Sequence, residues 1–202
     1  MGNHQMTHTS EDLHGNVPHQ ADVALLLIDM INDFEFKDGA ALFERALPVA
    51  RNMARLKQRT KQAGIPTLYV NDNFGQWQSD FNKLIDHCLY DGVRGQPIVE
   101  LLKPEADDYF VLKPKHSGFF STTLNILLEY LGARTLILCG VAGNICVLFT
   151  ANDAYMRDFR LFIPNDCVAS LTPEDNDFAL RQMQSVLGAD TGASTGLDLA
   201  GL

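Results

Sequence analysis

The chain has 202 residues, of which 46% are hydrophobic and 20% charged, a composition typical of a packed globular domain and not of a disordered chain. Its 25 acidic and 16 basic residues give a formal net charge of −9, so neither nucleic acid nor an anionic membrane is expected as a partner. The longest apolar run, residues 23–28, is far shorter than the roughly 20 residues that a membrane-spanning helix needs.

The first residues of the chain differ in composition from the rest. Residues 1–21 are polar, carry four of the six histidines at irregular spacing and lack the apolar stretch of a signal peptide. We therefore expect a disordered tail over 1–21 and one folded domain over 22–202. The four cysteines form no CxxC pair, which without an export signal indicates reduced thiols and a cytoplasmic location.

From residue 23 onwards, short runs that are apolar throughout alternate with amphipathic stretches. Runs in which polar residues do not occupy every second position are typical of strands that are buried on both faces. The predicted strands are residues 23–29, 67–71, 109–112, 135–139 and 161–163, with a weak sixth within 188–191. This alternation predicts the α/β class, with a parallel sheet, helices on both of its faces and right-handed crossovers.

Between these strands the apolar residues recur every three or four positions, as in helices. Pro48 suits the first turn of the first helix, a second helix follows Ser79, and Gly132 ends the third. The last helix begins with Thr172 as its cap and Pro173 in its first turn. The predicted helices are residues 48–63, 81–88, 124–131, 146–157 and 173–187.

Reactive side chains follow three of the predicted strands: Asp29, Lys113 and Cys146. Active sites in parallel α/β folds lie beyond the carboxyl ends of the strands, so these residues are candidates for one site. Cys146 falls in the first turn of a predicted helix, where backbone N–H groups and a nearby ammonium favour a thiolate. A carboxylate can then exchange the thiol proton, and loop N–H groups can stabilise an oxyanion.

Each of these residues also has a structural interpretation. Asp29 could cap the turn after its strand, Lys113 could be a surface amine, and Cys146 could be a small buried hydrophobic residue. The other cysteines, Cys88, Cys139 and Cys167, are expected to be buried. Lys115 and His116, in the loop after Lys113, compete with Lys113 for a role in the site. Lys115 is interpreted as a surface charge and His116 as a solvated loop residue, with contact to a ligand as the alternative for His116.

Three segments together resemble the isochorismatase-like cysteine hydrolase superfamily, which includes nicotinamidases, N-carbamoylsarcosine amidases and ureidoacrylate amidases. The segments are DMINDF at residues 29–34, KPKHSGF at 113–119 and GVAGNICV at 140–147. They resemble the first-strand motif, the lysine loop and the nucleophile turn of that family. The resemblance extends over about residues 22–187, so the domain at 22–202 is identified as an isochorismatase-like hydrolase domain.

The resemblance implies a single three-layer domain with a six-stranded, mostly parallel sheet in Rossmann-type order, frequently as a homodimer or homotetramer. It implies catalytic roles for Asp29 as the acid and base, Lys113 as the charge partner and Cys146 as the nucleophile. It also implies a cis peptide bond between Val141 and Ala142, with the N–H groups of Ala142 and Cys146 forming the oxyanion hole.

Departures from the family pattern narrow the expected activity. Nicotinamidases carry an Asp-x-His pair after the second strand to hold a metal, but Phe74 stands at the histidine position here. His87 alone cannot replace that set, so neither a metal nor another cofactor is expected. Phe34, Trp77 and Phe119 are predicted to line the substrate pocket, whereas Phe120 is predicted to be a core residue.

Isochorismatases hydrolyse a vinyl ether and generally lack the nucleophilic cysteine, so Cys146 favours acyl transfer. The leading hypothesis is a cysteine hydrolase that cleaves a C–N bond of a small amide, carbamoyl or ureido compound through a thioester. One alternative is vinyl-ether hydrolysis with Asp29 as the acid. The other is a ligand-binding or redox-sensitive scaffold without catalytic activity.

Overall fold

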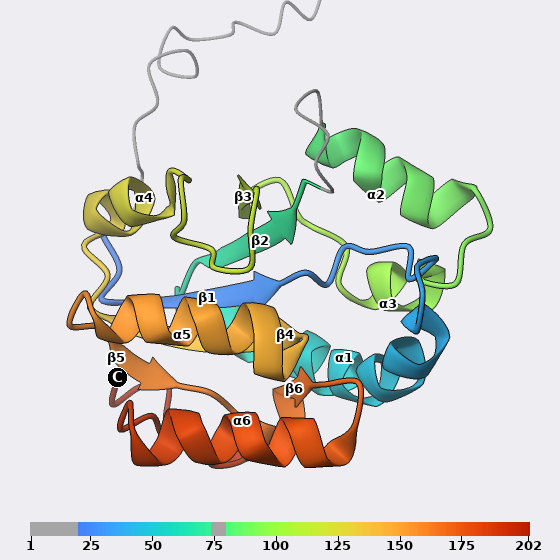
Figure 1. Cartoon of the computed structure of the whole chain (residues 1–202). Helices are drawn as coiled ribbons and strands as arrows, with labels where there is room; N and C mark the ends of the chain where they lie inside the picture. The colour runs from blue at the N-terminus through green and yellow to red at the C-terminus, as the bar shows by residue number, and fades with distance from the viewer. Residues whose placement is uncertain (1–19, 74–79) are drawn as a thin grey trace, which may run out of the picture.

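The computed structural model describes residues 20–73 and 80–202 and shows a parallel sheet between two layers of helices (Figure 1). The strand order is β3-β2-β1-β4-β5, with β6 also paired to β4. The predicted α/β class, six parallel strands and Rossmann-type order are therefore confirmed. The strands are β1 Val23–Ile28, β2 Thr67–Asp72, β3 Tyr109–Lys113, β4 Thr135–Val141, β5 Arg160–Phe162 and β6 Val168–Ala169.

The two central strands explain why the apolar runs show no alternation. Every residue of β1 and of β4 is buried, because helices cover both faces of the sheet. β1 lies between β2 and β4 and pairs with both in parallel register. The chain therefore reverses its winding direction next to β1, where it passes from β3 back to β4.

The sixth strand is not where the sequence pattern suggested. β5 pairs with Thr135–Ile137 of β4, and β6 pairs with Gly140 and Val141 further along the same strand, so β5 and β6 follow one another at one edge. Within 188–191 only Asp190 makes an isolated bridge, to Phe162. A strand of two residues, such as β6, is too short to show an apolar period.

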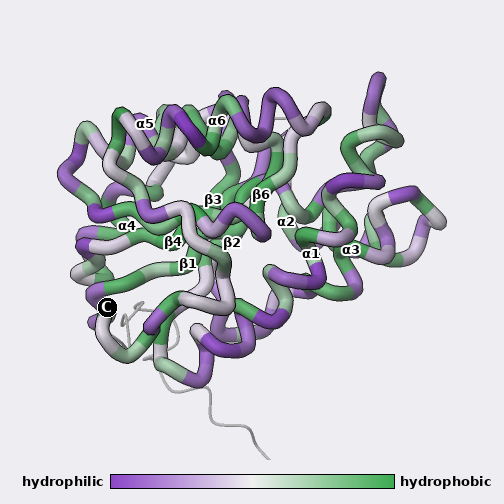
Figure 2. Tube along the Cα trace, turned by 90° about the horizontal axis from the view of Figure 1, so that it is seen from below, coloured by the Kyte–Doolittle hydropathy of each residue, from purple (hydrophilic) through white to green (hydrophobic). Residues whose placement is uncertain are grey.

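Helices α1–α3 pack on one face of the sheet and α4–α6 on the other, with the hydrophobic strands between them (Figure 2). Gly132 ends α4 in a left-handed conformation, and the Thr172 side chain accepts a hydrogen bond from the Asp175 N–H at the start of α6, as the sequence predicts. No described helix combines the length and apolarity needed to cross a membrane. The helices are α1 Gly39–Gln62, α2 Phe81–Tyr90, α3 Gln96–Leu101, α4 Leu124–Leu131, α5 Leu148–Tyr155 and α6 Pro173–Ser185.

The first helix begins earlier than predicted, at Gly39, so Pro48 lies inside it and not in its first turn. Proline cannot donate a hydrogen bond to the carbonyl of Glu44, four residues before it. Both residues are exposed, so water can satisfy that carbonyl, while Leu42 and Ala50 keep the opposite side of the helix in the core. The second helix begins at Phe81, as predicted, with Asp80 as its cap, and α3 was not predicted.

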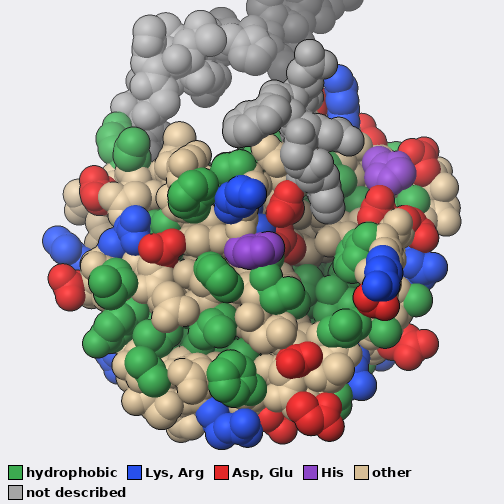
Figure 3. All heavy atoms as spheres, viewed as in Figure 1, with side chains coloured by type: hydrophobic (Ala, Val, Ile, Leu, Met, Phe, Trp, Pro, Cys, Tyr) green, Lys and Arg blue, Asp and Glu red, His purple; other side chains and the backbone are tan. Residues whose placement is uncertain are grey.

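Helices α5 and α6 combine small inner residues with large outer ones. Ala151, Ala154 and Ala179 are fully buried against the sheet, and small contact residues let helices pack at short distance. Hydrophobic side chains remain exposed on these helices, among them Phe149 and Phe178, and Figure 3 shows hydrophobic side chains on the side of the molecule that carries α5 and α6. The close packing brings the start of α5 to the carboxyl ends of the strands.

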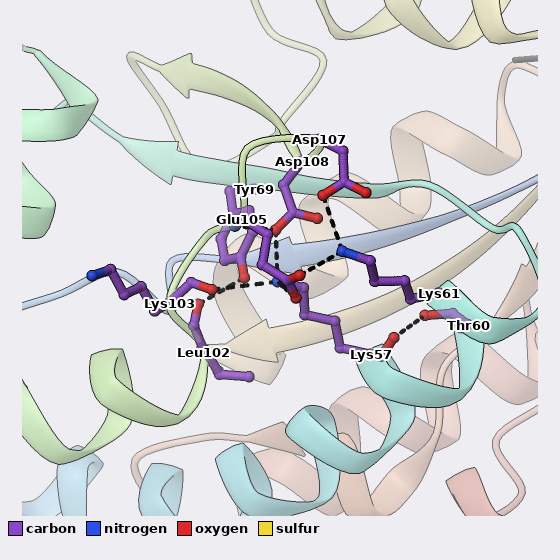
Figure 4. A network of polar contacts seen from close by, with 9 residues as sticks. All are labelled: Lys57, Thr60, Lys61, Tyr69, Leu102, Lys103, Glu105, Asp107 and Asp108. Carbon is purple, nitrogen blue, oxygen red and sulfur yellow. Dashed lines mark hydrogen bonds and ion pairs between the residues drawn. The ribbon is translucent and has the colours of Figure 1, made fainter. Parts of the chain in front are cut away.

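A network of charged side chains joins the end of α1 to the loop before β3 (Figure 4). Lys57 is 6% exposed, and its ammonium nitrogen lies 2.6 Å from Oδ2 of Asp108, which is also buried. On the exposed side, Lys61 pairs with Glu105 and Asp107. The network lies at the amino-terminal edge of the sheet, opposite the ends of the strands that carry the candidate site, so we assign it a structural role.

Replacing Lys57 with alanine is expected to lower the free energy of unfolding by about 3–5 kcal/mol, because the Asp108 carboxylate would stay buried without its ammonium partner. Urea unfolding of the variant and the wild type measures this difference. The matched control is Lys61→Ala, which removes an exposed ion pair and should change stability little. Equal changes in the free energy of unfolding would show that the buried ion pair stabilises the fold no more than the exposed one.

Candidate active site

The candidate site lies at the carboxyl edge of the sheet, where three strands deliver polar side chains. Asp29 follows β1, Lys113 is the last residue of β3, and Cys146 follows β4 after a short turn. Because β2 and β4 flank β1, these strand ends meet beside the point where the winding direction reverses. The structure brings the three residues together.

Lys113 is the centre of the cluster and has no solvent exposure. Its Nζ atom lies 2.9 Å from Asp29 Oδ2, 3.2 Å from the Lys115 carbonyl oxygen, 3.4 Å from Cys146 Sγ and 3.5 Å from Asp72 Oδ2. Burial alone would lower the pKa of Lys113, but the surrounding negative groups raise it above its ordinary value. An ammonium has three N–H donors for these four acceptors, so Lys113 acts within the cluster and has no free donor for a ligand.

Asp29 is 6% exposed and leaves the extended strand conformation with a φ of 54°. Aspartate tolerates a left-handed conformation better than most residues do, and this conformation ends the extended backbone of β1 at Asp29. Oδ1 of Asp29 accepts a hydrogen bond of 2.7 Å from the Asp72 backbone N–H, while Oδ2 faces Lys113. Burial raises the pKa of Asp29 above its ordinary value, although the Lys113 ammonium opposes this shift.

Asp72 is a member of the cluster that the sequence interpretation did not include. It is the last residue of β2, and its carboxylate lies 3.5 Å from Lys113 Nζ. Its backbone N–H also holds the Asp29 carboxylate. The available signal was its position directly after the apolar run at 67–71, the same signal that identified Asp29.

Cys146 lies in a π-helical turn, Gly143–Val147, that leads directly into α5. The Leu148 N–H donates to the Gly143 carbonyl, five residues back, as in a π-helix. The preceding peptide bond, between Val141 and Ala142, is cis, as the family resemblance implies. The assignment of the Ala142 and Cys146 N–H groups to an oxyanion hole stays a prediction.

Two positions in this turn require glycine. Gly140 has a φ of 140°, and a Cβ atom there would lie 2.2 Å from the carbonyl oxygen of Ile28 on the neighbouring strand. A Cβ atom on Gly143 would come within 3.0 Å of three side chains, those of Val168, Ser170 and Asn176. The turn therefore packs tightly against β1, β6 and α6, which fixes the place of the sulfur.

The sequence interpretation expected an ionised sulfur, and the structure contradicts this for the free protein. Burial and the neighbouring negative charge of Asp29 raise the pKa of the Cys146 thiol to about 12, although Lys113 opposes them. Cys146 is only 9% exposed, so desolvation outweighs the favourable field of the helix start. These surroundings favour the protonated thiol, so a nucleophile forms when a nearby base takes its proton.

Thr150 connects the lysine loop to the nucleophile turn, a role that the sequence gave no reason to expect. Its hydroxyl accepts a hydrogen bond of 3.0 Å from the Gly118 N–H and donates one of 2.7 Å to the Cys146 carbonyl. Thr150 is completely buried, so neither bond competes with water. A side chain of α5 thus ties the loop that follows Lys113 to the turn that carries Cys146.

Replacing Thr150 with valine keeps the shape of the side chain and removes both hydrogen bonds. We expect the free energy of unfolding to fall by about 1–3 kcal/mol, because the Gly118 N–H is left buried without an acceptor. Thermal or urea unfolding measures the loss. Thr150→Ser keeps the hydroxyl and should be the milder change, so a serine variant as unstable as the valine variant would contradict this account.

The aromatic residues predicted to line the pocket are buried where the structure describes them, and their contact with a substrate stays a prediction. Phe34 and Phe119 are 0% and 5% exposed and belong to the hydrophobic cores on the two faces of the sheet. Phe120, predicted to be a core residue, is instead 54% exposed. Neighbouring phenylalanines in a loop carry no pattern that tells which one turns inwards. Trp77 lies outside the described residues.

The histidine considered for metal binding has other partners. His87 Nδ1 lies 2.7 Å from a carboxylate oxygen of Asp91, and Nε2 lies 3.4 Å from one of Asp33. Hydrogen bonding to Asp91 raises the pKa of His87, which favours a protonated ring and disfavours metal binding. Within residues 20–73 and 80–202, no group of three or more His, Cys, Asp or Glu side chains is arranged to hold a metal ion.

The second described histidine lies beside the site, as the alternative interpretation of this loop residue requires. His116 is exposed, as expected for a loop residue, but its Nδ1 atom lies 3.9 Å from Cys146 Sγ. Lys115 is exposed too, and only its carbonyl takes part in the cluster. Cys88, Cys139 and Cys167 are buried free thiols, as predicted.

Comparison with known sequences gives one consistent family. Residues 23–194 match the isochorismatase domain. The uncharacterized isochorismatase family protein YaaI of Bacillus subtilis is 46% identical over 171 residues, which are 85% of this chain and 93% of that protein. The isochorismatase of the same organism is 32% identical over 169 residues, 81% of this chain, and this chain spans about half of its length, 53%.

Comparison with solved structures agrees with the sequence matches. The crystal structure of N-carbamoylsarcosine amidase from Thermoplasma acidophilum has a TM-score of 0.68 and 26% sequence identity, and the match covers 88% of this chain and 99% of that one. The shared fold therefore covers most of this chain and almost all of the solved structure.

Proposed function

The chain belongs to the isochorismatase family, whose activities are hydrolytic, and from this premise we propose that it hydrolyses a C–N bond of a small amide, carbamoyl or ureido compound. The observation that carries the proposal is the contact of one buried ammonium with a carboxylate at 2.9 Å and a sulfur at 3.4 Å. A base, a charge partner and a thiol in mutual contact are the groups that covalent acyl transfer needs. The structural likeness to an N-carbamoylsarcosine amidase supports the same class of substrate.

The first half-reaction forms a thioester. Asp29 takes the proton of the Cys146 thiol, and the sulfur attacks the carbonyl carbon of the substrate, so a C–S bond forms and the carbonyl oxygen becomes an oxyanion. The N–H groups of Ala142 and Cys146 are proposed to stabilise that oxygen. Asp29 then returns the proton to the leaving nitrogen, the C–N bond breaks, and ammonia or an amine departs.

The second half-reaction restores the thiol. Asp29 takes a proton from a water molecule, whose oxygen attacks the thioester carbon, and the C–S bond breaks as the acid product leaves. The sulfur then regains its proton from Asp29. Lys113 stays protonated throughout, because the carboxylates around it raise its pKa, and it offsets the negative charge that passes between Asp29 and the sulfur.

Vinyl-ether hydrolysis is the second candidate. The raised pKa of Asp29 favours its protonated form, which is the form that an acid catalyst needs, and a curated relative is an isochorismatase. In that case Cys146 takes no part, and Cys146→Ala would hydrolyse isochorismate at the wild-type rate. Loss of activity in this variant excludes the alternative.

A panel of small amides, ureas and carbamates, assayed for release of ammonia or amine, tests the proposed function directly. We expect turnover of at least one N-carbamoyl or amide compound, with the thioester on Cys146 trapped by acid and located by mass spectrometry. Parallel assays with a chelator test the expectation that no metal is needed. No turnover of any compound, with a thiol that oxidises but does not acylate, would support the scaffold without catalytic activity.

We also propose a cytoplasmic location, supported by the four free cysteines, none of which is paired in the structure. Assembly into a homodimer or homotetramer stays a prediction, which light scattering of the purified protein tests.

A further inference from the structure

The sulfur of Cys146 has different neighbours on its inner and outer sides. Lys113 and Asp29, which are 0% and 6% exposed, surround it from within the protein. His116 is exposed and lies beside the same atom, with its Nδ1 at 3.9 Å from Sγ. His116 is thus an exposed side chain in contact with a sulfur whose other neighbours, Lys113 and Asp29, are buried.

The loop holds His116 in place on both sides. The carbonyl of Lys115 accepts a hydrogen bond from Lys113, and the hydroxyl of Ser117 donates one to the Asp153 carboxylate on α5. The imidazole itself meets the Phe149 ring edge to face, with centroids 5.4 Å apart and an interplanar angle of 61°. The ring is thus oriented before any substrate arrives, which is a requirement for specific recognition.

The imidazole has hydrogen-bonding capacity left. A distance of 3.9 Å to sulfur is long, so Nδ1 is only weakly engaged, and no hydrogen bond to Nε2 is made by any described residue. A neutral imidazole offers one donor and one acceptor, which match the carbonyl and the N–H of an amide. Lys113 cannot serve in this role, because its donors are used within the cluster.

We propose that His116 is a substrate-contacting residue, whose imidazole hydrogen-bonds the amide or ureido group of a compound bound at the sulfur of Cys146. This inference rests on the proposed function, since it places the reacting carbonyl at the sulfur. His116 then selects compounds that carry an amide over compounds of similar size that lack one. Loss of one hydrogen bond between neutral groups corresponds to about a 3- to 10-fold weaker contact.

The test compares alkylation of Cys146 by iodoacetamide, which carries an amide, and by iodoacetonitrile, in which a nitrile replaces it. Because both reagents react with the same thiol, its intrinsic reactivity cancels in the ratio of the two rate constants. We expect His116→Phe, which keeps a ring against Phe149, to lower the ratio about 3- to 10-fold. His116→Gln, which keeps a donor and an acceptor, should retain most of it, and His87→Gln is the matched control with no contact to the sulfur.

An unchanged ratio in His116→Phe would overturn the proposal, and so would an equal slowing of both reagents, which would mean that His116 acts on the thiol. For a hydrolysed amide, we expect the same variant to raise KM by the same factor with little change in kcat. A fall in kcat at constant KM would contradict a binding role. If the wild type hydrolysed no amide, the proposed function would fail, while the alkylation ratio would still decide the contact.

Discussion

Replacing Cys146 with alanine is expected to lower kcat for amide hydrolysis by at least about 10⁴-fold, because no other group can form the covalent intermediate. The three other cysteines are fully buried, so none can replace the lost sulfur. Steady-state rates together with mass spectrometry of acid-quenched reactions measure the effect, and the thioester adduct should be absent from the variant. Cys88→Ala, a buried cysteine on α2, is the matched control.

The structure explains why the fold survives this substitution. Cys146 forms no disulfide bond. Its backbone is held by the π-helical turn and by Thr150, both of which remain in the variant. Loss of activity therefore reports on chemistry, provided that the circular dichroism spectrum is unchanged. A variant that keeps the wild-type rate would refute the thioester route and leave acid catalysis by Asp29.

Asp29→Asn is expected to reduce kcat by about 10²- to 10⁴-fold, the range for loss of a general acid and base. The amide keeps the size of the side chain but cannot take the proton of a thiol whose pKa is about 12. Asp33→Asn is the matched control, since Asp33 follows the same strand and contacts His87 instead of the cluster. Comparable losses in both variants would mean that the charge of Asp29 has no special role.

The same residue sets the expected pH dependence. Asp29 must be ionised to accept the thiol proton, so kcat/KM should fall as the pH decreases through its pKa. Burial raises that pKa, which places the acid limb above the pH at which an exposed aspartate would titrate. The apparent pKa of this limb is a property of the coupled cluster of Asp29, Lys113 and Cys146 and not of Asp29 alone. Rates measured from acid to neutral pH locate it, and a limb at the ordinary value of aspartate would contradict the effect of burial.

The parts of the fold that follow from local patterns were predictable. Fully apolar runs identified β1 and β4 because both faces of the sheet are covered, and Thr172 and Gly132 marked helix ends by their own chemistry. What the patterns lack is information on contacts between distant segments. β6 consists of two residues next to β4, and α1 continues through Pro48 because tertiary packing on Leu42 and Ala50 stabilises both sides of it.

In the candidate site, too, some features were predictable from the sequence and others were not. The positions of Asp29, Lys113 and Cys146 follow from the ends of parallel strands, and the structure brings all three into contact. Their protonation does not follow from position, because it depends on how much water the folded chain removes from each group. The contact of Thr150 with two loops and of His116 with the sulfur likewise arises between segments that no sequence period relates.

The high pKa of the Cys146 thiol has a consequence for the enzyme between turnovers. Peroxides and adventitious electrophiles react with thiolates far faster than with thiols, so a sulfur that keeps its proton resists oxidation to sulfenic acid. Reactivity then increases when Asp29 takes the thiol proton. The burial that disfavours ionisation of the sulfur thus also slows its chemical damage.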